Sequence, residues 1–372
     1  MTPGSSSPSS STPTRPNTHW REQADGDALR NLLDELDIQP PGTPSFELVS
    51  EWAAKHVVRM DVDGKPWAYI RYLLGPASHY PDRWRHLEFG PLLFEARVGP
   101  RVLGLNAESE SLKGRAVIIE AALNPISRED LEDRAPEAIS LLARLHGNGA
   151  LNEALSSHLT DADRVAFSPL GTLFAETRER WFEALAARWR AFDLAEIEKL
   201  LWVVNELMDA LATYRQATGR ISIVVPAHND PNHGNFMVNR QGALRMIDFE
   251  EMSLNNPVAD LGVFLTWYVD QDQHGAMLEE NYPLASPSAV LDRMKVWVPL
   301  RYLGIAAHWA ARMTRARDLN SYEYAANSLE EWLRGACELV YNGPVPPHLD
   351  KILRATHRSL LKRGARFFRN NR

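Results

Sequence analysis

The chain has 372 residues, of which 44% are hydrophobic and 24% are charged, a composition typical of globular proteins and not of disordered, collagenous or membrane proteins. Its formal net charge of −7 gives no general reason to bind nucleic acid, because phosphates require a basic face. No stretch approaches the roughly 18 to 20 consecutive apolar residues of a membrane span, and the single cysteine and the lack of a signal-like apolar segment lead us to expect the cytoplasm.

The N-terminal third predicts a disordered leader followed by a small sheet. Residues 1–19 are mostly Ser, Thr, Pro and Gly, too little apolar area to offset the entropy of ordering. Short β-type runs follow between 44 and 74, with an Asp-Gly turn between KHVVRMDV and KPWAYIRYLL. A helical pattern over 81–99 and two more strands, PRVLGLNAE and RAVIIEAAL, complete five strands around one helix. We expect this first lobe to span 20–123.

The rest of the chain predicts a second, mainly helical lobe over 124–372. From about residue 135, apolar residues repeat at i, i+3 and i+4. A short β-rich insertion interrupts this pattern with the compact apolar runs ISIVVPAHND, NFMVN and ALRMIDF. Helical patterns then resume over 258–268, 287–315, 321–341 and 347–363. The fold class we expect is therefore α+β.

One segment carries recognisable chemistry, PAHNDPNHGNFMVNRQGALRMIDFEEMSLNNPVADLG (226–262). It contains the spacing H-x-D-x-x-x-x-N and, 13 residues after that asparagine, the triplet DFE. The polar residues concerned are His228, Asp230, Asn235, Asp248 and Glu250. Phosphoryl transfer needs a carboxylate that orients the attacking hydroxyl, together with oxygen ligands that hold Mg²⁺ against the phosphates. These residue types meet both needs, and a polar hairpin with chance spacing is the alternative.

This segment resembles the loops of the aminoglycoside phosphotransferase and choline kinase-like family. HNDPNHGNFMVN is similar to the family's catalytic loop, MIDFEE to its metal loop, and LLARLHG (141–147) to a helix end that follows its hinge. The resemblance covers about 45–315. It implies a bilobal protein-kinase-like fold, with a small antiparallel-sheet N-lobe that binds nucleotide and a large, mainly helical C-lobe that holds the catalytic and metal loops and the substrate.

The resemblance also implies roles for single residues, with ATP or GTP and Mg²⁺ as cofactors. Asp230 corresponds to the catalytic base, and His228 belongs to the same catalytic loop and braces it. Asn235 and Asp248 correspond to the Mg²⁺ ligands. Asp260, at the start of the next helix, corresponds to a structural brace.

Two features of the N-lobe depart from the family pattern. In the strand AYIRYLL, Arg71 occupies the position of the family's phosphate-binding lysine. Arginine keeps its positive charge and can grip phosphate with two N–H groups, so the electrostatic role can survive. Glu88 on the following helix is the ion-pair partner that the resemblance implies, a solvated carboxylate being the alternative. The loop SEWAAK (50–55) has no glycine where a close backbone approach to phosphates would favour one.

Few other side chains of the N-lobe are candidates for contact with the nucleotide. Ser50, Trp52 and Lys55 either contact the nucleotide or form a plain surface hairpin. The hinge is expected at IIEAAL, where Glu120 to Ala122 would offer backbone groups to the base. Because these hydrogen bonds involve the main chain, the choice between adenine and guanine stays open.

Two features bear on the acceptor. The stretch VDQDQHGAMLEE (269–280), which contains Asp270, has four acidic residues and no lysine or arginine, so it would attract a polycation, a solvated loop being the alternative. Trp267 and other aromatic residues on the C-terminal helices either cage a quaternary ammonium or belong to the core. The other aromatic residues are Tyr268, Trp297, Trp309 and Trp332. Glu250 is a further candidate substrate residue.

The sequence thus predicts a small-molecule kinase whose acceptor is a small, hydroxyl-bearing and cationic compound, with an aminoglycoside-like antibiotic first. The alternatives are a choline or ethanolamine kinase and a catalytically weak regulatory module, which Arg71 and the glycine-free loop would favour. A protein-serine kinase fits worse, because no A-P-E element follows residue 262. We expect no nucleic-acid or membrane partner, and we interpret the basic end 357–372 as a solvated helix end.

Overall fold

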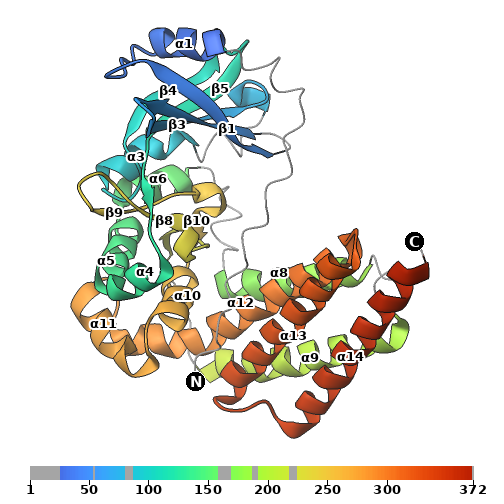
Figure 1. Cartoon of the computed structure of the whole chain (residues 1–372). Helices are drawn as coiled ribbons and strands as arrows, with labels where there is room; N and C mark the ends of the chain where they lie inside the picture. Colours follow the sequence, from blue (N-terminus) through green and yellow to red (C-terminus); the bar gives the residue numbers. More distant parts are fainter. Residues whose placement is uncertain are drawn as a thin grey trace. The chain divides into compact units, whose positions relative to one another are not determined.

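The computed structural model divides into two compact units (Figure 1). Unit 1 is Met1–Pro125 with Met237–Glu250, and unit 2 is Ile126–Phe236 with Glu251–Arg372. The structure describes residues 26–52, 55–79, 87–157, 169–186, 192–217 and 224–370. The expected leader over 1–19 lies outside these residues. Within them, no helix is long and apolar enough to cross a membrane.

Unit 1 is built on an antiparallel sheet of five strands in the order β1-β2-β3-β5-β4, as the sequence predicts. The strands are β1 (Pro44–Trp52), β2 (Lys55–Val62), β3 (Lys65–Leu73), β4 (Val102–Ser109) and β5 (Arg115–Ala121). The expected turn joins β2 to β3, with Asp63 at φ 52° and Gly64 at φ 71°. Two such residues form the type of turn that matches the twist of the strands.

Helices cover the two faces of this sheet. The helix α1 (Gly26–Glu35), which the sequence analysis did not predict, packs Leu29 and Leu32 against the face that carries Ile70 (Figure 1). In the predicted helix over 81–99, Leu87 and Glu88 and the short α3 (Gly90–Glu95) are helical, and residues 80–86 lie outside the described part. A short 3₁₀ helix, η2 (Ala77–His79), precedes it. A Cβ at Gly90 would lie 2.9 Å from Cδ1 of Ile118, so glycine lets this helix approach the opposite face.

The segment Met237–Glu250 belongs with unit 1, whereas the sequence placed it in the helical lobe. The reason is strand pairing and one further backbone bond. The strands β6 (Asn124–Pro125), β8 (Phe236–Val238) and β9 (Leu244–Met246) form a three-stranded sheet in the order β6-β8-β9. The backbone N–H of Met246 donates to the carbonyl of Val98 at 2.8 Å. The metal-loop residue Asp248, which follows β9, is therefore carried by unit 1.

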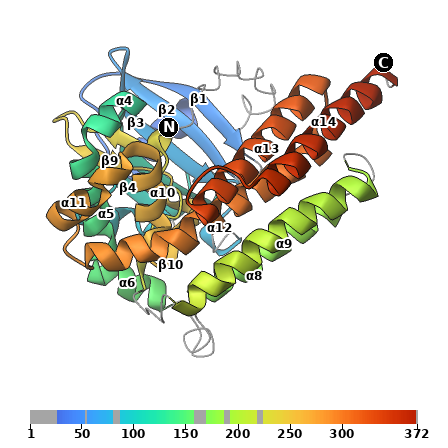
Figure 2. The same ribbon diagram turned by 90° about the horizontal axis from the view of Figure 1, so that it is seen from below.

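Unit 2 is mainly helical, as predicted. Its helices are α4 (Arg128–Asp133), α5 (Ala135–His146), α6 (Gly149–Ser156), α8 (Pro169–Ala186), α9 (Leu194–Ala217), α10 (Val258–Tyr268), α11 (His274–Asn281), α12 (Pro287–Arg315), α13 (Leu319–Tyr341) and α14 (Pro347–Asn370). Two short strands, β7 (Val225–Ala227) and β10 (Ser253–Asn255), pair with each other. Short 3₁₀ helices occur at η3 (His233–Asn235), η4 (Phe249–Glu251) and η5 (Gln271–Gln273). Figures 1 and 2 show α12, α13 and α14 side by side.

The packing of α8 on α12 is fixed at one point by an indole. Trp181 on α8 is 1% exposed, and its Nε1–H donates to the carbonyl of Leu303 on α12 at 3.1 Å. A buried indole that keeps its hydrogen bond holds one helix in a defined register on the other. The neighbouring positions of α8 therefore face fixed positions of α12.

A buried carboxylate joins α10 to two other parts of unit 2. Asp260, in the first turn of α10, is fully buried. Its Oδ2 accepts from Nε2 of His146 at 2.9 Å and from the backbone N–H of His228 at 2.7 Å, and its Oδ1 accepts from the backbone N–H of Asn229 at 2.7 Å. The other ring nitrogen of His146 contacts the hydroxyl of Tyr282 at 2.9 Å. The carboxylate thus links α5, α10 and the loop after β7.

Replacing Asp260 with Asn is expected to destabilise the protein by about 3 kcal/mol, because an amide N–H₂ would then face buried N–H donors. Chemical denaturation at pH 7 measures this loss. Asp209→Asn is the matched control, since Asp209 is an exposed carboxylate on α9 and its replacement should change stability by less than about 0.5 kcal/mol. Equal stabilities of the two variants would contradict the role of Asp260.

The same carboxylate predicts a pH dependence. Burial acts to raise the pKa of Asp260, but the hydrogen bond from His146 and that from the His228 backbone leave this pKa below its usual value. A carboxyl whose pKa is lowered on folding stabilises the protein fully above its unfolded pKa, about 3.9, and less as the pH falls through the folded value. The stability gap between wild type and Asp260→Asn should therefore be constant from pH 5 to 8 and narrow below about pH 4. A gap that widened on acidification would contradict this sign.

Candidate active site

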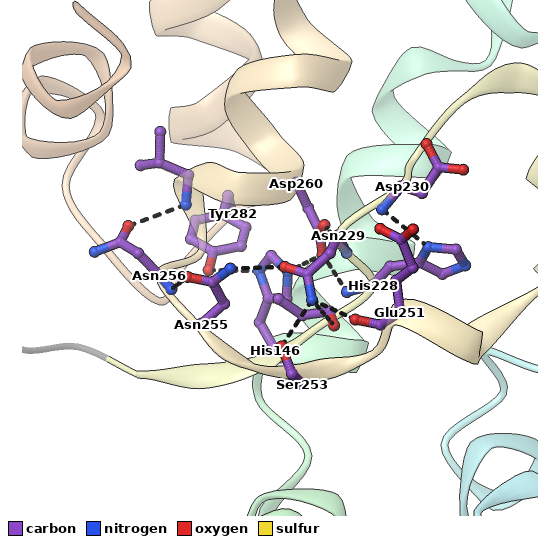
Figure 3. Close-up of polar contacts among 12 residues, drawn as sticks. His146, His228, Asn229, Asp230, Glu251, Ser253, Asn255, Asn256, Asp260 and Tyr282 are labelled. Carbon is purple, nitrogen blue, oxygen red and sulfur yellow. Dashed lines mark hydrogen bonds and ion pairs between the residues drawn. The ribbon is translucent and has the colours of Figure 1, made fainter. Parts of the chain in front are cut away.

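The loop that follows β7 is held in an unusual conformation by Asn229 (Figure 3). Its φ of 67° lies in the left-handed region, which asparagine tolerates better than most residues. Its side-chain amide donates to the carbonyl of Glu251 at 2.6 Å and to the hydroxyl of Ser253 at 2.9 Å. Its side-chain oxygen accepts from the amide of Asn255 at 2.8 Å. Asn229 therefore ties the loop to β10 and to the turn before it.

The conformation of this loop presents the carboxylate of Asp230. The backbone N–H of Asp230 donates to Nδ1 of the buried His228 at 3.3 Å. Its Oδ2 accepts from the amide of Asn232 at 2.7 Å and from that of Asn235 at 3.1 Å. The side chain is 37% exposed, and its other oxygen, Oδ1, lies 3.9 Å from Nη2 of Arg301.

Asn235 has the orientation that a cation ligand requires. Its Nδ2 donates to the carbonyl and to the carboxylate of Asp230, at 2.8 and 3.1 Å, which leaves its carboxamide oxygen for a metal. Asp248, in unit 1, is exposed and has a φ of 64°. The described residues contain no group of three or more His, Cys, Asp or Glu that could hold a metal. Carboxamide and carboxylate oxygens are each of the type that Mg²⁺ takes as ligands, alongside phosphate and water oxygens.

A second bond from α10 holds the far end of the catalytic loop. The backbone N–H of His233 donates to the hydroxyl of Tyr268, the last residue of α10, at 2.7 Å. Burial raises the pKa of Tyr268 to about 12, so the phenol stays neutral. Asp260 binds the start of the loop and Tyr268 binds its end, and one helix therefore fixes both ends of the segment that carries Asp230.

In unit 1, the structure corrects the expected partner of Arg71. Its guanidinium pairs with the carboxylate of Glu120, not with Glu88, which is exposed. The reason is the strand register. Arg71 of β3 lies opposite Ile118 of β5, and Glu120 is two residues further on the same face. Both side chains of the pair are largely buried, at 16% and 8% exposed.

The other predicted nucleotide residues also have partners in unit 1. Lys55 at the start of β2 forms an ion pair with Glu250, so this carboxylate braces the end of the metal loop. The backbone N–H of Ala122 donates to the carbonyl of Trp67 at 2.9 Å, and it is therefore not the donor that we expected for a base. Ser50 lies in β1 opposite Val57. Residues 53–54 of the glycine-free loop lie outside the described part of the chain.

A pocket of about 190 Å³ in unit 2 adjoins the catalytic loop. Its apolar wall comes from α10 and α12 and includes Val263 and Trp297, and its polar side includes Asn229 and Ser253. Arg301 of α12 lines the pocket, and its Nη2 donates to the carbonyl of Asn229 at 3.0 Å and lies 3.9 Å from Oδ1 of Asp230. Asp230 itself does not line the pocket, and Arg301 connects its Oδ1 to the lining.

The three residues predicted for the acceptor, Glu250, Asp270 and Trp267, do not line this pocket. Asp270 is exposed and immediately precedes η5. Trp267 is held in an aromatic cluster, where its indole N–H donates to the hydroxyl of Tyr302 at 3.1 Å and its ring packs against Trp332. Of the aromatic residues considered above, Trp297 is the one that lines the pocket, and it is 5% exposed.

Sequence reasoning missed three residues at the site: Arg180, Asn229 and Arg301. Asn229 could have been found, because it stands inside the motif H-x-D-x-x-x-x-N and next to Asp230. Arg180 and Arg301 lie on helices far from that motif in the sequence, and nothing in their local pattern distinguishes them from surface arginines. Only the packing of α8 and α12 brings them to the pocket.

Comparisons with solved structures show a shared fold. A Plasmodium vivax ethanolamine kinase is 12% identical with a TM-score of 0.56, covering 90% of this chain and 88% of that one. A spectinomycin phosphotransferase in complex with ADP and spectinomycin is 14% identical with a TM-score of 0.54, covering 89% and 98%. The GDP complex of an aminoglycoside 2′-phosphotransferase is 15% identical with a TM-score of 0.54, covering 84% and 99%. The bilobal protein-kinase-like fold predicted from the sequence is confirmed.

We find no match to the chain among curated proteins. Residues 93–296, more than half of the chain, match the phosphotransferase enzyme family, and they include the whole catalytic segment from His228 to Asp260. The chain therefore belongs to the phosphotransferase enzyme family (APH).

Proposed function

We propose that the protein is a small-molecule kinase that transfers the γ-phosphoryl group of ATP or GTP to a hydroxyl group, with Asp230 as the base. The observation that carries this proposal is the geometry of the Asp230 carboxylate. One oxygen is held by two side-chain amides, and the other is open beside a pocket lined by Arg301. A fixed, half-exposed carboxylate of this kind can orient an attacking hydroxyl.

In the proposed reaction the acceptor oxygen forms a bond to the γ-phosphorus as the bond to the leaving nucleoside diphosphate breaks. Oδ1 of Asp230 takes the hydroxyl proton, and the products are a phosphate ester and the diphosphate. Asn235 and Asp248 are the proposed ligands of Mg²⁺. When bound, the ion neutralises charge on the phosphates. Arg71 is the proposed phosphate-binding residue of unit 1, kept in place by Glu120.

The nucleotide and the class of acceptor receive support from proteins of similar fold. The spectinomycin phosphotransferase is solved with ADP and the aminoglycoside phosphotransferase with GDP, which supports a purine nucleotide as donor. Their acceptors, and that of the ethanolamine kinase, are small molecules. Amine-bearing alcohols such as aminoglycosides and ethanolamine therefore belong in the first acceptor panel.

Replacing Asp230 with Asn should lower kcat by about 10²- to 10⁴-fold, because the base is lost while the shape is kept. Phosphoryl transfer from Mg-ATP and Mg-GTP is measured as a mass gain on a panel of aminoglycosides, ethanolamine, choline, sugars and sugar acids. Asp209→Asn, an exposed change on α9, should keep full activity. Undiminished turnover in Asp230→Asn would show that another group is the base.

Replacing Arg71 with Gln should weaken Mg-ATP binding about 10- to 100-fold, because a charged hydrogen-bond donor to phosphate is lost. Arg71→Lys should keep part of this affinity, since it keeps the charge but not the two-pronged grip. Isothermal titration measures both. The single change Arg71→Gln leaves the buried carboxylate of Glu120 without its partner. The double variant Arg71→Gln with Glu120→Gln removes that charge, so a loss of nucleotide binding can be distinguished from a loss of stability.

The Arg71→Lys variant also tests the alternative of a degraded, regulatory site. If the arginine is the working residue, turnover falls or stays equal when lysine replaces it. A large gain in turnover would instead mean that the site had lost its phosphate-binding lysine, and the proposed role of Arg71 would be wrong.

A further inference from the structure

The pocket beside Asp230 has an unusual balance of charge for a site that was expected to bind a cation. Its lining contains two arginines, Arg180 and Arg301, and one carboxylate, Glu251. The rest of the lining is apolar or neutral. Asp230 does not line the pocket, but its Oδ1 lies 3.9 Å from Nη2 of Arg301 and offsets part of that charge. Within the lining itself positive charge exceeds negative charge, which favours an anionic group over an ammonium group beside Arg180.

Arg301 is placed to hold an anion and is only partly used by the protein. A guanidinium has five N–H donors in a fixed fork. One group, Nη2, donates to the carbonyl of Asn229 and lies too far from Oδ1 of Asp230, at 3.9 Å, for a direct hydrogen bond. No other hydrogen bond of this side chain to the described residues is observed. The remaining donors of the fork suit the paired oxygens of a carboxylate or a phosphate.

Arg180 brings the second positive charge from another helix. It is exposed on α8 and lines the pocket, and within the described part of the chain it forms no hydrogen bond or ion pair. Its Nη1 lies 3.9 Å from the position of a Cβ at Gly304, which is three residues after Arg301 on α12. The bond from the neighbouring Trp181 to Leu303 sets this register. The arrangement is therefore built by helix packing.

Positively charged side chains also surround His308 on α12. Partial burial and then neighbouring positive charges lower the pKa of His308 on α12. Those charges belong to Arg312, Arg180 and Arg315. Glu251 acts in the opposite direction and does not reverse the shift. The surroundings of His308, which does not itself line the pocket, are thus more positive than negative.

The acidic residues that predicted a cationic acceptor lie elsewhere. Asp270, Asp272, Glu279 and Glu280 are exposed on or beside η5 and α11, and none of them lines the pocket. The pocket is also small, since about 190 Å³ is below the roughly 300 Å³ at which drug-sized ligand sites begin. A compact acceptor fits this volume better than an aminoglycoside of several rings.

We infer that the acceptor is a compact hydroxyl compound with an anionic group, a carboxylate or a phosphate, which Arg180 and Arg301 hold in this pocket while its hydroxyl faces Asp230. The inference rests on the proposed kinase function, because it names the acceptor of the same site. It replaces the cationic acceptor that the sequence predicted.

The test compares acceptors that share a skeleton and differ in charge. Phosphoryl transfer from Mg-ATP and Mg-GTP is measured with glucose, glucosamine, glucuronate and glucose 6-phosphate, and with glycerol, glycerate and glycerol 3-phosphate. The anionic members should have the highest kcat/KM of each series. Preference for glucuronate and glycerate indicates a carboxylate, and preference for the two phosphates indicates a phosphate. Binding of each compound in the presence of Mg-ADP is measured in parallel by calorimetry.

Arg180→Gln is the diagnostic variant, because the side chain is exposed and its replacement should not affect folding. It should raise the KM or Kd for the anionic acceptor about 10- to 100-fold, with an unchanged KM for nucleotide. Arg180→Lys should recover part of that loss. Arg178→Gln is the matched control, since Arg178 is an exposed arginine on the same helix that does not line the pocket. This control should leave every constant within about twofold.

The outcomes separate this inference from the proposed function. Asp230-dependent transfer that prefers neutral or amine-bearing acceptors would overturn the inference and leave the kinase proposal intact. A rise in nucleotide KM alone in Arg180→Gln would assign the arginines to the nucleotide, and the inference would again be wrong. If no acceptor is phosphorylated, the kinase proposal fails and the pocket is not an acceptor site. Anion binding that Arg180→Gln weakens would then show an anion site without transfer, and absence of anion binding would overturn both the proposed function and the anion site.

Discussion

The catalytic loop depends on one buried charge, the carboxylate of Asp260. Its two oxygens accept from the backbone N–H groups of His228 and Asn229 and from the ring of His146. A short loop with a left-handed residue would otherwise leave its N–H donors unsatisfied in the interior, which is costly. By accepting these bonds, Asp260 allows the chain to turn at the residues that precede Asp230. Tyr268, at the other end of α10, then fixes where the loop ends.

Ion pairs with carboxylates likewise hold two cationic side chains of unit 1 in place. The pair Arg71 and Glu120 follows directly from the register of β3 and β5. The family resemblance implied a different partner for Arg71, namely Glu88 on the next helix. A partner on the adjacent strand keeps the guanidinium in place without help from that helix. The ion pair of Lys55 and Glu250 likewise ties the metal-loop segment to the sheet.

The sequence was a good guide where the chemistry lies in one continuous segment. The catalytic motif places Asp230 and Asn235 five residues apart, so their hydrogen bond is a local matter that spacing can predict. The five-stranded sheet and the long helices were also predictable, because hydrophobic periodicity determines them. The partner of Arg71 was not, since it depends on a strand register that no local pattern specifies.

The charge of the proposed acceptor pocket could not be predicted from the sequence. An acidic sequence can still carry a site whose lining has more positive than negative charge. Net charge and acidic stretches describe the whole surface, whereas recognition depends on the few side chains that packing brings together. Here the packing of α8 on α12 brings Arg180 and Arg301 to one pocket, and the acidic stretch over 269–280 lies outside it. Phosphoryl transfer to an anionic acceptor requires two negative groups to approach each other. If the pocket holds the acceptor as we infer, the guanidinium groups of Arg180 and Arg301 would lower that repulsion before the reaction begins.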